Sequence, residues 1–133
     1  MSVAFIPELD SKLRLSKDWT FDVHFEYRNS TLFVADGHPE QLNWRENKKP
    51  YKRTLKAGTE FVVSRIYVRS DAKDFSSVTL CVTKTDDEKL LAQKPKKVPF
   101  RSHSIPHWAR FWVKLVDFNN AEFEVISFTF SNR

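Results

Sequence analysis

A strict alternation of apolar and polar residues over Trp19–Tyr27 is the feature that most limits how this chain can fold. Apolar side chains occupy every odd position of the segment, and polar side chains occupy every even one. A period of two places successive side chains on opposite faces of an extended strand. The segment therefore predicts a half-buried β-strand with one aromatic face turned toward a core.

Further strands are predicted on both sides of this one. Thr59–Arg69 is rich in β-branched and aromatic residues on both faces, which indicates a central strand. Ser77–Lys84 alternates in the same way and is expected to pair with it as a hairpin. Shorter strands are predicted at Leu9–Leu15, Thr31–Ala35, Arg110–Phe118 and Glu122–Phe130, with the pair Asn119-Asn120 as a tight turn between the last two.

The remaining local signals complete the expected architecture. Pro39–Asn47 predicts one or two helical turns, because proline suits a first helical position and an acidic residue follows it. In the last strand the apolar positions change parity between Val125 and Ile126, which indicates a β-bulge and local curvature. We expect one mainly β domain over residues 1–133, either a small, strongly curved antiparallel β-barrel or a two-sheet sandwich. It would contain five to seven strands and one short helix.

Composition excludes several classes of protein. The two glycines, Gly37 and Gly58, cannot supply the glycine-rich loops that bind nucleotide phosphates, and the single cysteine, Cys81, allows no internal disulfide. No unbroken apolar run is longer than the four residues of Leu32–Ala35, so no membrane span is predicted, and the first residues do not have the pattern of a secretory signal. These features predict a cytoplasmic protein without a cofactor.

The net charge of +5 is concentrated in two segments of the chain. Residues 45–56 contain six basic residues and one acid, and residues 89–101 contain five basic residues and no acid. The second of these lies in a long, proline-containing stretch, 89–108, that predicts an irregular loop. Clustered positive charge attracts polyanions and acidic proteins, although lysine-rich loops can also serve only solubility.

Aromatic residues lie among these cations, and the combination is typical of proteins that hold single strands of nucleic acid. Cations follow the phosphates while rings stack on unpaired bases. The sequence thus predicts a non-catalytic module that binds single-stranded or structured nucleic acid through two basic loops, 45–56 and 89–108. The candidate contact residues are Trp44, Arg45, Lys48, Lys49, Tyr51, Lys52, Arg53, Lys94, Lys96, Lys97 and Arg101.

A protein partner would use the same surface in the alternative reading. The cations would then dock on an acidic protein that handles nucleic acid and would inhibit it, with aromatic and arginine side chains as anchors. Additional anchors would be Arg65, Arg69, Phe75 and Trp112.

The histidines offer a second alternative. In the predicted strand His24 lies between Asp22 and Glu26 on one face, and a histidine flanked by carboxylates can act as a general acid–base group in a small ribonuclease. The same three residues also fit the solvated face of an amphipathic strand. His103 and His107 have a zinc-like spacing, but a proline lies between them and no cysteine is near, so no metal site is predicted.

Three stretches of the chain, Thr54–Arg69, Asp74–Leu80 and Arg110–Asp117, are similar to uncharacterised small proteins of phages and mobile elements. The resemblance covers about half of the chain and carries no functional motif, so it assigns no active residue. Such proteins often bind and divert host nucleic-acid machinery. The resemblance therefore favours the alternative in which this protein inhibits a host protein.

Overall fold

The computed structural model describes residues 6–43, 49–68, 76–93 and 109–127. Within these ranges the strands are β1 (Lys12–Leu15), β2 (Trp19–Val23), β3 (Tyr51–Leu55), β4 (Glu60–Tyr67), β5 (Ser77–Lys84), β6 (Arg110–Lys114) and β7 (Phe123–Ser127). The helices are the 3-10 turns η1 (Tyr27–Asn29) and η2 (Pro39–Asn43) and the short α-helices α1 (Ser30–Ala35), α2 (Glu88–Leu91) and α3 (Leu115–Phe118).

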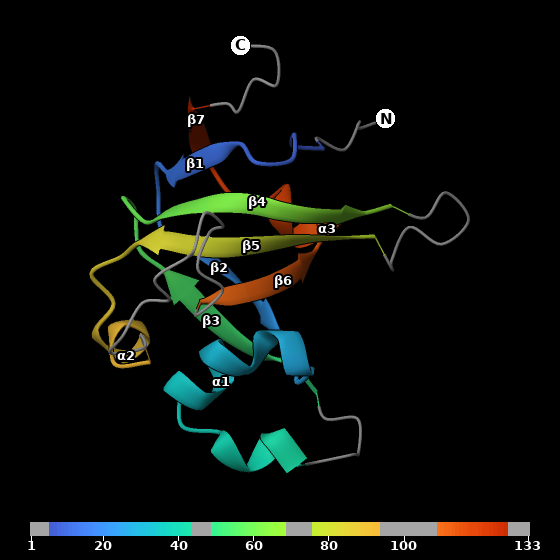
Figure 1. Ribbon diagram of the computed structural model, residues 1–133, viewed down its shortest axis with the longest axis vertical. Coiled ribbons are helices and arrows are strands. Elements are labelled where there is room, and N and C mark those ends of the chain that lie inside the picture. The colour runs from blue at the N-terminus through green and yellow to red at the C-terminus, as the bar shows by residue number, and fades with distance from the viewer. Residues whose placement is uncertain (1–5, 44–48, 69–75, 94–108, 128–133) are drawn as a thin grey trace, which may run out of the picture.

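The strands form two antiparallel sheets (Figure 1). One has five strands in the order β6-β5-β4-β1-β7, and the other consists of β2 and β3. The mainly β fold is confirmed, and so is the hairpin of β4 and β5, with β4 at the centre of the larger sheet. The two sheets do not close into a barrel among the described residues, so the arrangement corresponds to the sandwich that the sequence allowed.

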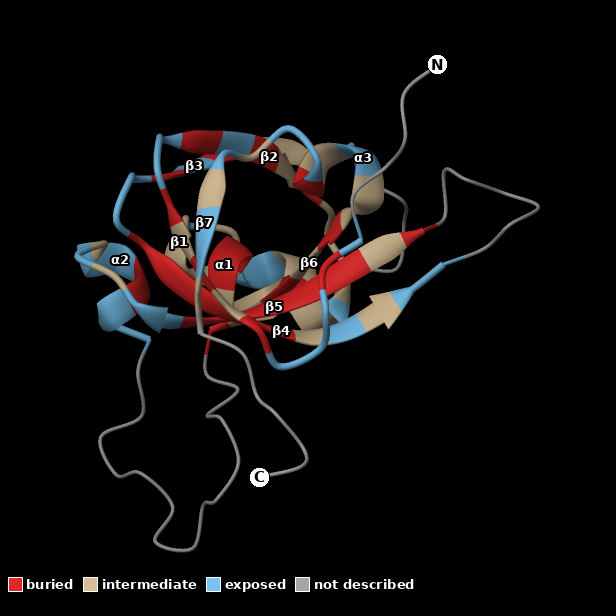
Figure 2. Cartoon of the chain, turned by 90° about the horizontal axis from the view of Figure 1, so that it is seen from above, coloured by how far each residue is buried: buried red, intermediate tan, exposed pale blue. Residues whose placement is uncertain are grey.

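An aromatic core fills the space between the sheets. The alternation in β2 turns Trp19 and Phe21 inward, where the Phe21 ring stacks on Phe111 of β6 with centroids 5.3 Å apart. Trp19 contacts Phe61 of β4 and donates its indole N–H to the carbonyl of Asp117 at 3.1 Å. Burial of each such side chain contributes roughly 1.5–3 kcal/mol. In Figure 2, α1 lies across the end of the space between the two sheets.

The last strand contains the irregularity expected from its sequence. β7 pairs with β1, and the register moves from Lys12 opposite Ser127 to Leu13 opposite Val125. One extra residue of β7, Ile126, is therefore accommodated between the two pairs, which is the definition of a bulge. The predicted bulge is confirmed at the position where the apolar parity changes.

The prediction of a strand at Thr31–Ala35 is wrong, because this segment is part of α1. The end of α1 explains the difference: His38 N donates to Phe33 O at 2.8 Å and Gly37 N donates to Val34 O at 3.1 Å. These two bonds form a Schellman motif, which requires a left-handed residue after the helix, and Gly37 has φ +95°. Gly37 is thus the residue at which the helix ends.

The region after β6 also differs from the prediction. The strand ends at Lys114, α3 follows, and Asn119 caps this helix by donating its backbone and side-chain N–H groups to Leu115 O. The expected hairpin between the last two strands is wrong, since β7 pairs with β1 and β6 pairs with β5. The sequence predicted a single short helix, but the described residues contain the three short α-helices α1, α2 and α3. None of the described helices is long and apolar enough to span a membrane.

Candidate functional site

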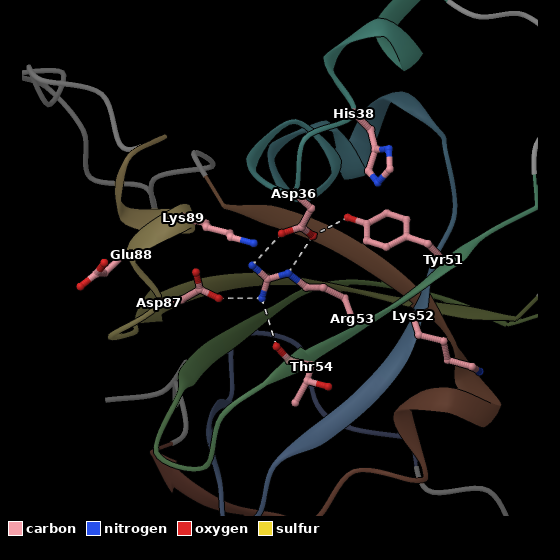
Figure 3. A pocket seen from close by; sticks show the side chains of 9 residues that line it. All are labelled: Asp36, His38, Tyr51, Lys52, Arg53, Thr54, Asp87, Glu88 and Lys89. Atoms are coloured by element: carbon pink, nitrogen blue, oxygen red, sulfur yellow. Dashed lines mark hydrogen bonds and ion pairs between the residues drawn. The ribbon is translucent and has the colours of Figure 1, made fainter.

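An open depression of about 620 Å³ lies between the end of α1, strand β3 and the start of α2 (Figure 3). It contains residues of both basic segments, because β3 belongs to residues 45–56 and Lys89 begins residues 89–108. We call it the first depression. Its lining residues are Asp36, His38, Tyr51, Lys52, Arg53, Thr54, Asp87, Glu88 and Lys89.

Arg53 lies at the centre of the first depression and is held by two carboxylates. Its guanidinium donates to Asp36 through Nε at 2.9 Å and Nη2 at 3.2 Å, and its Nη1 forms an ion pair with Asp87 at 2.8 Å. The Arg53 side chain is only 7% exposed. Asp36 ends α1 and Asp87 is the N-cap of α2, so the guanidinium joins both helices to β3.

This arrangement changes the role expected for Arg53. A buried guanidinium that donates to two carboxylates cannot contact a phosphate unless those bonds break, and breaking a buried charge pair is costly. Burial alone would raise the pKa of the Asp87 carboxyl, but hydrogen bonds from Arg53 and Leu90 N outweigh it and lower that pKa. Arg53 is therefore a structural link between the two basic segments.

Tyr51 is also anchored within the protein. Its hydroxyl donates to Asp36 Oδ2 at 2.5 Å, its ring stacks on Phe25 with centroids 5.4 Å apart, and the His38 ring lies 4.9 Å away. Burial and the neighbouring carboxylate of Asp36 raise the pKa of the phenol, so it stays neutral. The hydroxyl is occupied, and only the remaining ring surface of Tyr51 is open to a ligand.

The other candidate residues fall into two groups. Lys49 and Lys52 are exposed, and Lys52 forms an ion pair with Asp22 at 2.9 Å while 74% of its side chain remains accessible. The structure therefore brings Tyr51, Lys52 and Arg53 to one depression. Seven candidates lie outside the described residues: Trp44, Arg45, Lys48, Lys94, Lys96, Lys97 and Arg101.

A second depression, of about 540 Å³, adjoins the first one and shares Thr54 and Asp87 with it. Lys56 and Lys84 line it, and Lys89 lines the first depression on the other side of Asp87. All three lysines are exposed, and none of them forms an ion pair with a residue that the structure describes. We call these three residues the lysine rim.

The sequence interpretation named the segments that supply Lys56 and Lys89 but did not include Lys84. Lys84 lies at the end of β5, where the chain leaves the sheet next to the start of α2. An isolated lysine at a strand end carries no signal by itself. Only the pairing of β4 with β5, which places Glu60 opposite Lys84, brings it to this part of the surface.

The acid–base row expected around His24 does not form. The strand ends at Val23, and the Glu26 carboxylate accepts hydrogen bonds from Trp112 Nε1 at 2.7 Å and from Arg28 Nε at 3.0 Å. Asp22 pairs with Lys52 instead, and the His24 ring stacks on Trp112 with centroids 4.9 Å apart. The prediction that His24 shares one strand face with both carboxylates is wrong.

The other singled-out groups are easily placed. Cys81 is fully buried, and burial raises the pKa of its thiol, so it is a small core residue. The described residues contain no group of three histidine, cysteine or carboxylate side chains placed to hold a metal ion. His103, His107, Arg69 and Phe75 lie outside the described residues, and Arg65 is exposed on β4.

Comparisons with protein families, with curated proteins and with solved structures found no match for this chain. The site is therefore interpreted from its own geometry.

Proposed function

We propose that this protein is a non-catalytic module that binds single-stranded nucleic acid, with the phosphates following the lysine rim of Lys56, Lys84 and Lys89. The observation that carries the proposal is the adjacency of the two depressions at the place where the basic segments meet. The rim lysines are exposed, and none of them forms an ion pair with a described residue; Lys84 acts on the Glu60 carboxylate from a longer distance, and the close ion pairs of Glu60 are with Lys12 and Arg14. The charge of the rim lysines is therefore available to a ligand.

The lining of the two depressions contains five cations and four acids, so the proposal rests on the exposed rim lysines and not on the net charge of the lining. Arg53 is neutralised by Asp36 and Asp87, which removes it from the contact set and gives the depressions a fixed shape. Lys49, just before β3, is also exposed, and Lys52 on β3 is exposed but paired with Asp22. Further cations and a ring for stacking would come from the flanking parts of both segments: Trp44, Arg45, Lys48, Lys94, Lys96, Lys97 and Arg101.

A salt titration with a charge-matched control tests the proposal. Binding of a fluorescent 20-nucleotide single strand is followed by anisotropy for the natural protein, for Lys84→Gln/Lys89→Gln and for Lys17→Gln/Arg65→Gln. Each pair removes two exposed charges, but only the first pair touches the depressions. Loss of two phosphate contacts should reduce the slope of log K against log salt by about 1.4.

The control pair should keep the natural slope, since its residues lie on β4 and between β1 and β2. Equal losses in both variants would mean that only net charge matters and would remove the rim from the proposal. A natural protein that binds neither single-stranded DNA nor single-stranded RNA at low salt would end the nucleic-acid proposal altogether.

A protein partner is the second candidate, and one observation favours it. Asp36, Asp87 and Glu88 lie among the cations of the first depression, and such a mixture of charges suits a protein surface as well as a polyanion. The protein would then inhibit an acidic protein that handles nucleic acid in the cytoplasm. Partners that remain bound in a pull-down after nuclease treatment would support this candidate, whereas partners lost on treatment would support the first.

A further inference from the structure

An exposed tyrosine precedes an arginine that belongs to a group of stacked planar side chains at β6, the edge strand of the five-stranded sheet. Tyr27 is 72% exposed, the largest exposed fraction among the described large hydrophobic residues. In the same turn, the Arg28 guanidinium lies over the Trp112 ring, 5.7 Å from its centre. The His24 ring is parallel to that of Trp112, at 4.9 Å and an interplanar angle of 5°. We call these four residues the aromatic site.

Hydrogen bonds hold Arg28 and Trp112 of the aromatic site in place. Glu26 accepts from the indole N–H of Trp112 at 2.7 Å and from Arg28 Nε at 3.0 Å, and it caps the turn by accepting from Arg28 N. The fully buried Asn29 accepts from Trp112 N at 2.7 Å and donates to His24 O at 2.9 Å. A ligand that stacks on Arg28 would therefore meet a side chain that is already ordered, which lowers the entropic cost of binding.

The charges around the aromatic site are balanced. Arg28 is paired with Glu26, and the cation Lys114 near His24 is opposed by Asp22 and Asp117. A balanced site has no excess positive potential with which to select a phosphate. It favours a flat, uncharged ring, which can stack on an exposed tyrosine ring or on the plane of a guanidinium.

The aromatic site is connected to the first depression along the chain, through Phe25. Phe25, which lies in the chain between His24 and Glu26, stacks on Tyr51 at 5.4 Å, and Tyr51 lines the first depression. The β2–β3 register supports the connection, because Val23 is opposite Tyr51. The turn that carries Tyr27 and Arg28 thus follows a residue that packs against the lining of the first depression.

We propose that Tyr27, together with Arg28, stacks on an unpaired base of a single-stranded nucleic acid. This inference rests on the proposed function and adds the recognition of bases to that of phosphates. A single strand is required because the faces of bases in a duplex are already stacked on one another. The lysine rim would then supply the salt-dependent affinity, and the aromatic site would supply the preference for unpaired strands.

Two oligonucleotides of equal length separate the contribution of base stacking from that of phosphate binding. One is a thymidine 15-mer and the other a 15-mer of abasic sites, which has the same phosphates but no rings. Tyr27→Ala should weaken binding of the thymidine strand roughly 10-fold and leave binding of the abasic strand unchanged. Tyr27→Phe keeps the ring and should bind like the natural protein. Tyr67→Ala, at a tyrosine of β4 that is 44% exposed, serves as the matched control.

Each outcome decides between the proposals. If the natural protein binds neither strand, the proposed function fails. If it binds the thymidine strand and Tyr27→Ala binds that strand equally well, the base-stacking inference alone is overturned. Equal weakening of both strands by Tyr27→Ala would also overturn it, because the tyrosine would then contribute through the backbone. A capture of a protein partner that depends on Tyr27, without oligonucleotide binding, would assign the aromatic site to the second candidate.

Discussion

Arg53 and Asp87 form an ion pair with Nη1 and Oδ2 2.8 Å apart, which fastens strand β3 to the first turn of α2. Asp87 also caps α2 by accepting from Leu90 N at 3.1 Å, so one carboxylate connects helix and strand. Asp36 completes the arrangement from the end of α1. The guanidinium therefore determines how the surfaces of both depressions lie relative to each other.

Replacement of Arg53 should be strongly destabilising. Arg53→Gln leaves the carboxylates of Asp36 and Asp87 without their cation in a partly buried place, and the expected loss in the free energy of unfolding is about 3 kcal/mol. Lys52→Gln removes the neighbouring exposed cation and should cause little change. Urea unfolding of both variants measures the difference. Similar stabilities for the two would refute the structural role of Arg53.

The same ion pair should make the free energy of unfolding depend on pH in the acidic range. The pKa of Asp87 is lower in the folded protein than its ordinary value of 3.8, because the bonds from Arg53 and Leu90 N outweigh the effect of burial. A lowered pKa contributes stability that is fully present well above pH 3.8 and is lost as the pH falls through the folded value. In Asp87→Asn this contribution is absent, so the free energy of unfolding should fall less steeply between pH 5 and pH 3 than in the natural protein. Parallel curves would contradict the prediction.

The strands of this fold could be predicted because burial on one or two faces leaves a direct pattern in the sequence. Trp19–Val23 alternates because one face packs on the core, and β4 is apolar on both faces because it is central. The bulge in β7 could be predicted for the same reason, since the change in apolar parity shows where the buried face shifts by one residue. The prediction of a strand at Thr31–Ala35 was wrong because its β-branched and aromatic residues favour a strand, although Gly37 follows it as a helix-ending residue. The pairing partner of an edge strand such as β7 leaves no local pattern in the sequence.

The candidate site was predictable only as a region. Charge density located the two basic segments, but it could not distinguish a free cation from one that is neutralised within the fold. Arg53 and Lys56 look alike in the sequence, yet one is buried between two carboxylates and the other is exposed. That distinction depends on Asp36 and Asp87, which reach β3 only through the tertiary structure.

His24 should produce a second pH dependence, at higher pH. Burial, with a smaller contribution from Lys114, lowers the pKa of His24 below 6.5, while Asp22 and Asp117 oppose the shift. Between the two pKa values the unfolded chain binds more protons, so stability is complete above pH 6.5 and is lost as the pH falls through the folded value. His24→Phe keeps the contact with Trp112 without a titrating group, and its unfolding free energy should change less than that of the natural protein below pH 6.5. Equal pH dependence in thermal unfolding would disprove this.

Asn29 should be among the most sensitive polar positions of the fold, because it closes the free edge of β6. The outward N–H of Trp112 donates to Asn29 Oδ1, and Asn29 Nδ2 donates to His24 O, while the side chain is fully buried. Asn29→Ala leaves one donor and one acceptor of the backbone unpaired, which should lower the free energy of unfolding by about 2–3 kcal/mol. Asn29→Asp keeps the acceptor for Trp112 N but loses the donor to His24 O.

Hydrogen exchange and unfolding together test this role. In Asn29→Ala the amide of Trp112 should exchange faster than in the natural protein, whereas the amide of Phe111, on the same strand, should be affected only through global stability. Asn29→Asp should keep the Trp112 amide protected although its overall stability falls. If the Trp112 amide in Asn29→Ala is as protected as in the natural protein, Asn29 does not cover this edge. The rigidity argued for the aromatic site would then rest on the Glu26 bonds to Trp112 and Arg28 alone.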